Sequence, residues 1–252
     1  SVGPNLSLIK SFVCVDGKDW QTSSVENSKD FSLANLIKTR DSRFEASFYH
    51  KPTVKSKSCY LYPVKFIPRS ALKYLEVKGG APGVEYTSVN NLNGYPVLRY
   101  AEVLLNWIEA KAELSTLGAG SVTQADIDLS VNKIRNRPLA QEAVERGVQK
   151  TAPMELAALP DDPSRDSDVP ALLWEIRRER RMEFAFEHSR IIDLRRWKKL
   201  EYMDTDANAD LLSGTWVNFP AECPDDLVDD NKGKSRVMTA SGDLITFDGK
   251  NG

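Results

Sequence analysis

One helical segment, residues 171–190, constrains the fold of this chain more than any other part of the sequence. It carries a glutamate every fourth residue, at Glu175, Glu179, Glu183 and Glu187, so like charges repeat along one side of the helix. Such a column is destabilising unless cations approach it. Seven arginines are at hand: Arg177, Arg178, Arg180, Arg181, Arg190, Arg195 and Arg196. We therefore expect bidentate arginine–carboxylate pairs that join this helix to its neighbours.

The same residues admit a second interpretation, a surface for nucleic acid. Residues 175–199 hold nine Lys or Arg against five Asp or Glu, and Trp174 and Trp197 offer rings for stacking. The glutamates, however, are interleaved with the arginines, which does not favour a face that binds a polyanion. The whole chain has 34 basic and 36 acidic side chains, so no overall field attracts nucleic acid or anionic lipid.

Hydrophobic spacing predicts a mainly α chain of about one domain, with three parts. Residues 1–97 are expected to be loop and short strand, residues 98–200 a helical core, and residues 201–252 irregular. The 252 residues are 41% hydrophobic, which suffices for a sizeable core. No apolar run reaches the roughly 18 residues needed to span a bilayer.

The helical core is predicted to begin with a hairpin of two helices, over 98–117 and 123–137. One face of the first helix is apolar, Gly118 ends it, and Thr123 caps the second. That apolar face consists of Ala101, Leu104, Leu105, Ile108 and Ala112. Ile127, Val131 and Ile134 form the stripe of the second helix. The third helix follows Pro170 and bends near His188-Ser189 into a fourth. The apolar face of the third helix consists of Leu172, Leu173, Ile176 and Phe184.

The irregular parts carry weaker signals. We expect a short helix over 31–37 and a hairpin around Asp16-Gly17, flanked by Val13, Val15 and Trp20. Prolines confine 59–68 to an edge strand or extended segment, and glycines make 79–83 a surface loop. A short strand is expected over 216–220.

No motif for catalysis or metal binding stands out, and we expect no cofactor. The chain lacks GxSxG, HExxH, Walker and GxGxxG sequences, and His188 is expected to cap or bend a helix. Cys14, Cys59 and Cys223 lack zinc-site spacing, and one disulfide with a leftover thiol stays open. The acidic run at 225–230 lacks the spacing of a calcium loop, so we expect a solvated loop there.

Aromatic side chains in the irregular parts give a better argument for a ligand. Sugars present flat C–H faces that stack on Trp and Tyr rings, and loop-borne rings are costly to expose. The candidate ligand-binding residues are Trp20, Tyr49, Tyr60, Tyr62 and Trp216, and Tyr95 lies in a similar segment. Each of these rings has a core residue as its alternative interpretation.

Several stretches together resemble the SusD/RagB family. YPVLRYAEVLLNWIEAKAEL (95–114), VNKIRNRP (131–138) and LLWEIRRERRMEFAFEHSRIIDLRRW (172–197) are similar to its helical signatures. Asp16-Gly17 resembles its DG turn, and RDSRFEASFY (40–49) resembles its RDPRF-like motif. The resemblance covers about three quarters of the chain. It departs at His188 or Ser189, where the family usually has a glycine.

The resemblance implies an extracellular-facing outer-membrane lipoprotein that binds glycans, or peptides in some members, and delivers them to a TonB-dependent SusC-type transporter. It implies binding without catalysis. Family members are about twice as long, with the lipidated cysteine and most tetratricopeptide-like hairpins in the N-terminal half, so we expect a C-terminal fragment or a truncated relative that begins at Ser1. Two other classes stay open: a helical scaffold that docks a partner and binds no sugar, and a hydrolase with a pair of acids.

Overall fold

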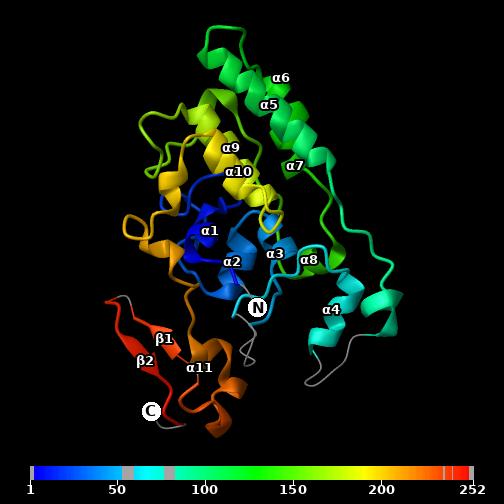
Figure 1. The fold of residues 1–252 in the computed structure, drawn as a ribbon, viewed down its shortest axis with the longest axis vertical. Coiled ribbons are helices and arrows are strands. Elements are labelled where there is room, and N and C mark those ends of the chain that lie inside the picture. Colours follow the sequence, from blue (N-terminus) through cyan, green and yellow to red (C-terminus); the bar gives the residue numbers. More distant parts are fainter. Residues whose placement is uncertain (1–2, 53–59, 77–82, 235, 240, 250–252) are drawn as a thin grey trace.

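The protein is mainly helical, as the sequence predicts (Figure 1). The computed structural model describes residues 3–52, 60–76, 83–234, 236–239 and 241–249. The helices are α1 Leu6–Ser11, α2 Leu33–Thr39, α3 Arg43–Ser47, α4 Arg69–Glu76, α5 Tyr100–Thr116, α6 Gln124–Ile127, α7 Lys133–Arg135, α8 Gln141–Glu145, α9 Ala171–Glu183, α10 Arg190–Arg196 and α11 Phe219–Glu222. A π-helical turn, Asp128–Asn132, joins α6 to α7. Short 3₁₀ turns are Val84–Tyr86, Ser88–Asn90, Leu156–Ala158, Leu200–Met203, Ala209–Leu211, Pro224–Asp226 and Asp229–Asn231.

Two strands near the C-terminus form a small antiparallel sheet. These are β1, Arg236–Met238, and β2, Leu244–Thr246, and Val237 lies opposite Ile245. Figure 1 shows this sheet beside α11, at the opposite end of the molecule from α5 and α6. The strands therefore lie far from the helical core.

The predicted helical hairpin is confirmed: α5 packs along α6, the π-helical turn and α7. All five residues of the predicted apolar face of α5 are buried. Gly118 takes a φ of +75°, and the Ala119 amide donates to the Leu114 carbonyl, which closes the end of α5. Thr123 and Asp126 cap α6 reciprocally through side chain and backbone.

The predicted third helix is α9, which packs against α5. It ends at Glu183, and the next residues turn the chain into α10 through left-handed conformations at Phe186 (φ +66°) and His188 (φ +61°). These two residues make the predicted bend. Because left-handed backbone is unfavourable for residues other than glycine, the bend bears strain of about 1–2 kcal/mol per residue.

Residues 1–97 contain more helix than the sequence predicts. The expected helix over 31–37 is present as α2, but α1, α3 and α4 were not expected. These helices have five to eight residues, so each presents too few side chains to show a 3.6-residue period. In α1, for example, only Leu6 and Ile9 are buried.

The predicted hairpin around Asp16-Gly17 is wrong. A tight turn is present, with Gly17 at φ +78°, but the strand-like pairing is made with residues distant in sequence. The Val15 amide donates to the Thr39 carbonyl at 2.9 Å, and the Asp41 amide donates to the Val13 carbonyl at 2.8 Å. Tertiary pairing therefore overrides the local turn signal.

The remaining predictions for irregular segments have mixed outcomes. Residues 60–68 are extended and paired through a single bridge between Phe48 and Pro63. The predicted strand over 216–220 is wrong, because Asn218 caps the short helix α11 there. Residues 79–82 of the predicted loop, and Cys59, lie outside the described residues. Cys14 is a buried free thiol.

Two hydrophobic clusters make up the core, and α9 contributes to both. The first gathers α1, α2 and α3 with Met182 of α9. The second gathers α5 and the α6–α7 hairpin with Leu173 and Ile176 of α9. The charged face of α9 consequently lies inside the molecule, between parts of the chain distant in sequence.

Candidate ligand-binding site

The glutamate column of α9 is bound by arginines from surrounding elements. Glu179 accepts hydrogen bonds from Arg43 Nη2 (2.6 Å) and Arg135 Nε (2.8 Å). Glu183 accepts from Arg99 Nη1 (2.6 Å) and from Arg137 Nη1 (3.1 Å). Arg99 also binds Glu187, and Arg178 binds Glu175. The prediction that this column joins α9 to its neighbours is confirmed.

The arginines of α9 and α10 are engaged in the same way. Arg180 pairs with Asp193 (3.0 Å) and Glu109 (3.2 Å), and Arg196 pairs with Glu109 (2.6 Å). The indole N–H groups of Trp174 and Trp197 bind Asp162 and Glu109, respectively. These groups form no continuous cationic face with free rings, so the nucleic-acid interpretation fails.

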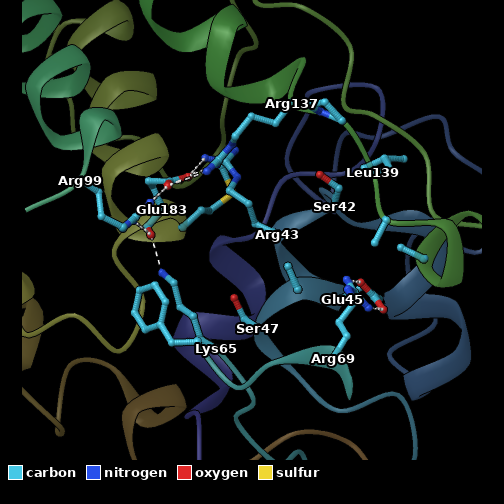
Figure 2. A pocket seen from close by; sticks show the side chains of 16 residues that line it. Ser42, Arg43, Glu45, Ser47, Lys65, Arg69, Arg99, Arg137, Leu139 and Glu183 are labelled. Atoms are coloured by element: carbon cyan, nitrogen blue, oxygen red, sulfur yellow. Dashed lines mark hydrogen bonds and ion pairs between the residues drawn. The ribbon is translucent and has the colours of Figure 1, made fainter. Parts of the chain in front are cut away.

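A cavity of about 300 Å³ opens beside this lattice of ion pairs (Figure 2). Its wall is built by α3, residues 65–69, Arg99, residues 137–143 and α9. Figure 2 shows Glu183 with its arginines on one side and Glu45 with Arg69 on the other. Arg69 donates to both oxygens of Glu45, at 2.9 and 2.7 Å. The cavity thus lies between two arginine–carboxylate groups, with apolar side chains in between.

Both acids of the cavity are held ionised. Burial raises the pKa of the Glu183 carboxyl, but Arg43, Arg137 and Arg99 more than offset this, and the pKa lies below its usual range. The pKa of the Glu45 carboxyl is likewise lowered, because hydrogen bonds and charge from Arg69 and from a second arginine outweigh burial. These carboxylates are therefore bases that are already engaged, not proton donors.

An exposed pair of aromatic rings stands at this cavity. Phe66 lines it, and Tyr95 packs edge-on against Phe66 with ring centroids 5.6 Å apart. Phe66 has a φ of +68°, a left-handed conformation that is strained for an aromatic residue. The preceding Lys65 fixes the turn by donating to the carbonyls of Glu183 (2.5 Å) and Ala185 (3.0 Å). Strained backbone that holds an exposed ring at a cavity is typical of functional sites.

The structure distributes the predicted aromatic residues between core and surface. Tyr49 is buried, so its prediction as a ligand-binding residue is wrong. Trp20 is half-buried and packs edge-on against Phe31 in the first core cluster. Tyr60 and Tyr62 are half-buried. Burial raises the pKa of Tyr60.

Trp216 is 53% exposed, as a ring that meets a ligand must be. None of the five predicted aromatic residues lines either of the two cavities described here. The sequence did not single out Phe66, because nothing in its local pattern signals a left-handed turn.

A second cavity, of about 610 Å³, lies next to the Asp16-Gly17 turn. It is lined by Asp16, Lys18, Arg135, Glu155 and Asp161 together with apolar residues, and no aromatic ring contributes to its wall. Sugar recognition relies on stacking rings, so the first cavity is the better candidate.

The described part of the chain contains no group of three His, Cys, Asp or Glu side chains placed to hold a metal ion. Among those residues, Asp225, Asp229 and Asp230 are exposed. No described helix combines the length and apolarity needed to cross a bilayer.

These features define a mainly helical protein whose charged side chains brace its interior and whose aromatic side chains flank an open cavity. The model of the SusD family matches residues 1–220, so the chain belongs to this family. Searches of curated proteins and of solved structures gave no significant match. Proteins of the family are in general non-catalytic, carbohydrate-binding proteins of nutrient uptake, associated with the outer membrane as lipoproteins.

Proposed function

We propose that this protein binds an oligosaccharide at the cavity beside Phe66 and Tyr95 and releases it unchanged to a TonB-dependent SusC-type transporter. In its full-length form it would face the cell exterior from the outer membrane, held by a lipid anchor. The observation that carries the proposal is the exposed Phe66–Tyr95 pair at a polar cavity, in a chain of the SusD family.

The chemistry of the cavity suits a sugar. The rings of Phe66 and Tyr95 offer apolar faces to the C–H side of a pyranose. Ser42 and Ser47 line the same cavity, and serine hydroxyls donate and accept hydrogen bonds with sugar hydroxyls. A cavity that combines apolar faces with a few polar groups is the usual form of a small-ligand site.

The state of the two acids supports binding over hydrolysis. A glycosidase needs one carboxylic acid with a raised pKa to protonate the leaving oxygen. In this cavity the pKa values of Glu45 and Glu183 are lowered, and arginines occupy both carboxylates. Neither is suited to donate a proton.

Calorimetric titration with a panel of oligosaccharides and short peptides tests the proposal. We expect weak binding of a sugar, because the exposed rings leave little surplus after the entropy of association. Tyr95→Ala should weaken that binding about 2- to 10-fold, as expected for one lost stacking contact. Trp216→Ala tests whether that exposed ring adds a second contact.

Tyr100→Ala is the matched control, since Tyr100 and Tyr95 are each 61% exposed and only Tyr95 touches Phe66. Loss of affinity in both variants, or in neither, would contradict the assignment of the site. Silence of the full-length protein toward every sugar would contradict the function.

A second candidate function, docking of a polypeptide, is supported by the outer face of α5. Exposed apolar residues recur there at spacings of three and four, as on a helix that packs against another helix. These residues are Tyr100, Val103, Trp107, Ala110, Leu114 and Leu117. The hairpin of α5 with α6–α7 would then act as a tetratricopeptide-type unit. Trp107→Glu should abolish association with the transporter and leave sugar binding unchanged, whereas association that survives the change argues against this face.

A further inference from the structure

Cationic side chains outnumber carboxylates on the wall of the first cavity. Five lining residues are basic, Arg43, Lys65, Arg69, Arg99 and Arg137, and two are acidic, Glu45 and Glu183. The groups that pair with them from behind are Arg135, Arg146, Asp41, Glu179 and Glu187. Together these described side chains are seven cations and five carboxylates, an excess of two positive charges.

One further acid lies close by. Glu45 and, more weakly, the exposed Glu142 raise the pKa of Arg69. Counting Glu142 leaves seven cations against six carboxylates, and one positive charge remains. The chain as a whole carries a net charge of −2, so this excess is local to the cavity.

The excess arises because each carboxylate of the cavity serves more than one arginine. Glu183 binds Arg43, Arg99 and Arg137. Glu45 binds both Arg69 and Arg146, at 2.7 and 2.9 Å. One carboxylate neutralises one guanidinium, so the surplus charge can be balanced only by solvent ions or by an anionic ligand.

Two of these arginines keep donors for a ligand. Of the five N–H groups that a guanidinium offers, Arg69 uses two and Arg137 uses three on described acceptors. Their side chains are 31% and 45% exposed, whereas Arg43 is buried. Arg69 and Arg137 can therefore bind an oxyanion without breaking the lattice.

We propose that the cavity selects an acidic glycan and that Arg69 and Arg137 bind its carboxylate or sulfate group. This inference rests on the proposed function and narrows its ligand class. The sugar ring stacks on Phe66 and Tyr95 while its oxyanion replaces solvent ions at the surplus guanidinium charge. A neutral sugar at the same site leaves that charge uncompensated.

Calorimetry with three oligosaccharides of equal length tests this selectivity. An oligogalacturonate carries carboxylates, a κ-carrageenan oligosaccharide carries sulfates, and a galacto-oligosaccharide is neutral. We expect at least one acidic ligand to bind about tenfold more tightly than the neutral one, as for one charge-assisted contact of about 1.4 kcal/mol. The preference should shrink as salt is raised, because the two arginines are partly exposed. Comparison of the two acidic ligands identifies which oxyanion is bound.

Arg69→Gln should remove most of the preference and leave affinity for the neutral ligand unchanged. Arg146→Gln is the matched control: Arg146 shares Glu45 with Arg69 and has a similar exposure, 27% against 31%, but does not line the cavity. It should keep the preference.

The outcomes separate this inference from the proposed function. Equal affinity for acidic and neutral ligands, lost in Tyr95→Ala, would overturn the selectivity and keep the sugar site. Acidic binding that is insensitive to both Tyr95→Ala and Arg69→Gln would place the ligand elsewhere and overturn the inference. Binding of none of the three ligands, together with silence across the wider panel, would overturn both.

Discussion

Removal of the Glu183 charge should destabilise the protein strongly. This carboxylate is 2% exposed and binds Arg43, Arg99 and Arg137, three cations from three different elements. Glu183→Gln keeps the shape of the side chain and leaves these cations without their shared counter-ion. Breaking a buried ion pair by removing one partner costs about 3–5 kcal/mol, because the other charge stays desolvated.

The structure places the expected loss at the lower end of that range. Arg43 retains Asp41 and Glu179 as partners, and nearly half of the Arg137 side chain meets solvent. We therefore expect Glu183→Gln to lower the free energy of unfolding by about 3 kcal/mol. For a chain of this size that corresponds to a fall in Tm of about 6–12 °C.

Urea unfolding followed by far-ultraviolet circular dichroism measures this loss. The midpoint should fall with little change in the slope m, as for a change in stability alone. Glu113→Gln is the matched control, because Glu113 is 43% exposed and pairs with a single arginine, Arg177, at 3.0 Å. Its effect should stay within about 1 kcal/mol. If Glu183→Gln were as mild as Glu113→Gln, α9 would not be held by its buried ion pairs.

Three further changes probe the same structure. Trp20→Ala should lower the free energy of unfolding by about 2 kcal/mol through lost core packing, while Trp216→Ala should change it by less than about 1 kcal/mol; thermal unfolding compares them. Burial lowers the pKa of Arg181 to about 9 and no described acid pairs with it, so Arg181→Met should be neutral or stabilising in urea, unlike Arg180→Met, which should lose about 3 kcal/mol. The folded-state pKa of Glu45 is lowered, so its stabilisation is present above about pH 4.5 and lost as pH falls through the folded pKa; acid titration of unfolding should be shallower in Glu45→Gln.

The sequence predicted the parts of the fold that depend on repeated local patterns. The apolar faces of α5 and of the α6–α7 hairpin repeat over several turns, and all their predicted residues are buried. The glutamate column of α9 predicted its own arginine partners, because like charges at i+4 require them. The family resemblance added the correct family.

The parts that sequence missed depend on contacts between distant residues. The Val13–Val15 strand pairs with Thr39 and Asp41, which no local turn signal reveals. Five separate segments build the first cavity, so it has no continuous sequence signature. Tyr49 was misassigned because a loop-borne tyrosine and a core tyrosine have the same local sequence context.

A crystal structure of the protein with a bound oligosaccharide tests the central claim most directly. We expect an intact sugar with one ring against Phe66 and Tyr95 and an acidic group within hydrogen-bonding distance of Arg69 or Arg137. A sugar bound at another surface with this cavity empty, or a ligand cleaved in place, would contradict the claim that this protein is a passive glycan receptor at this site.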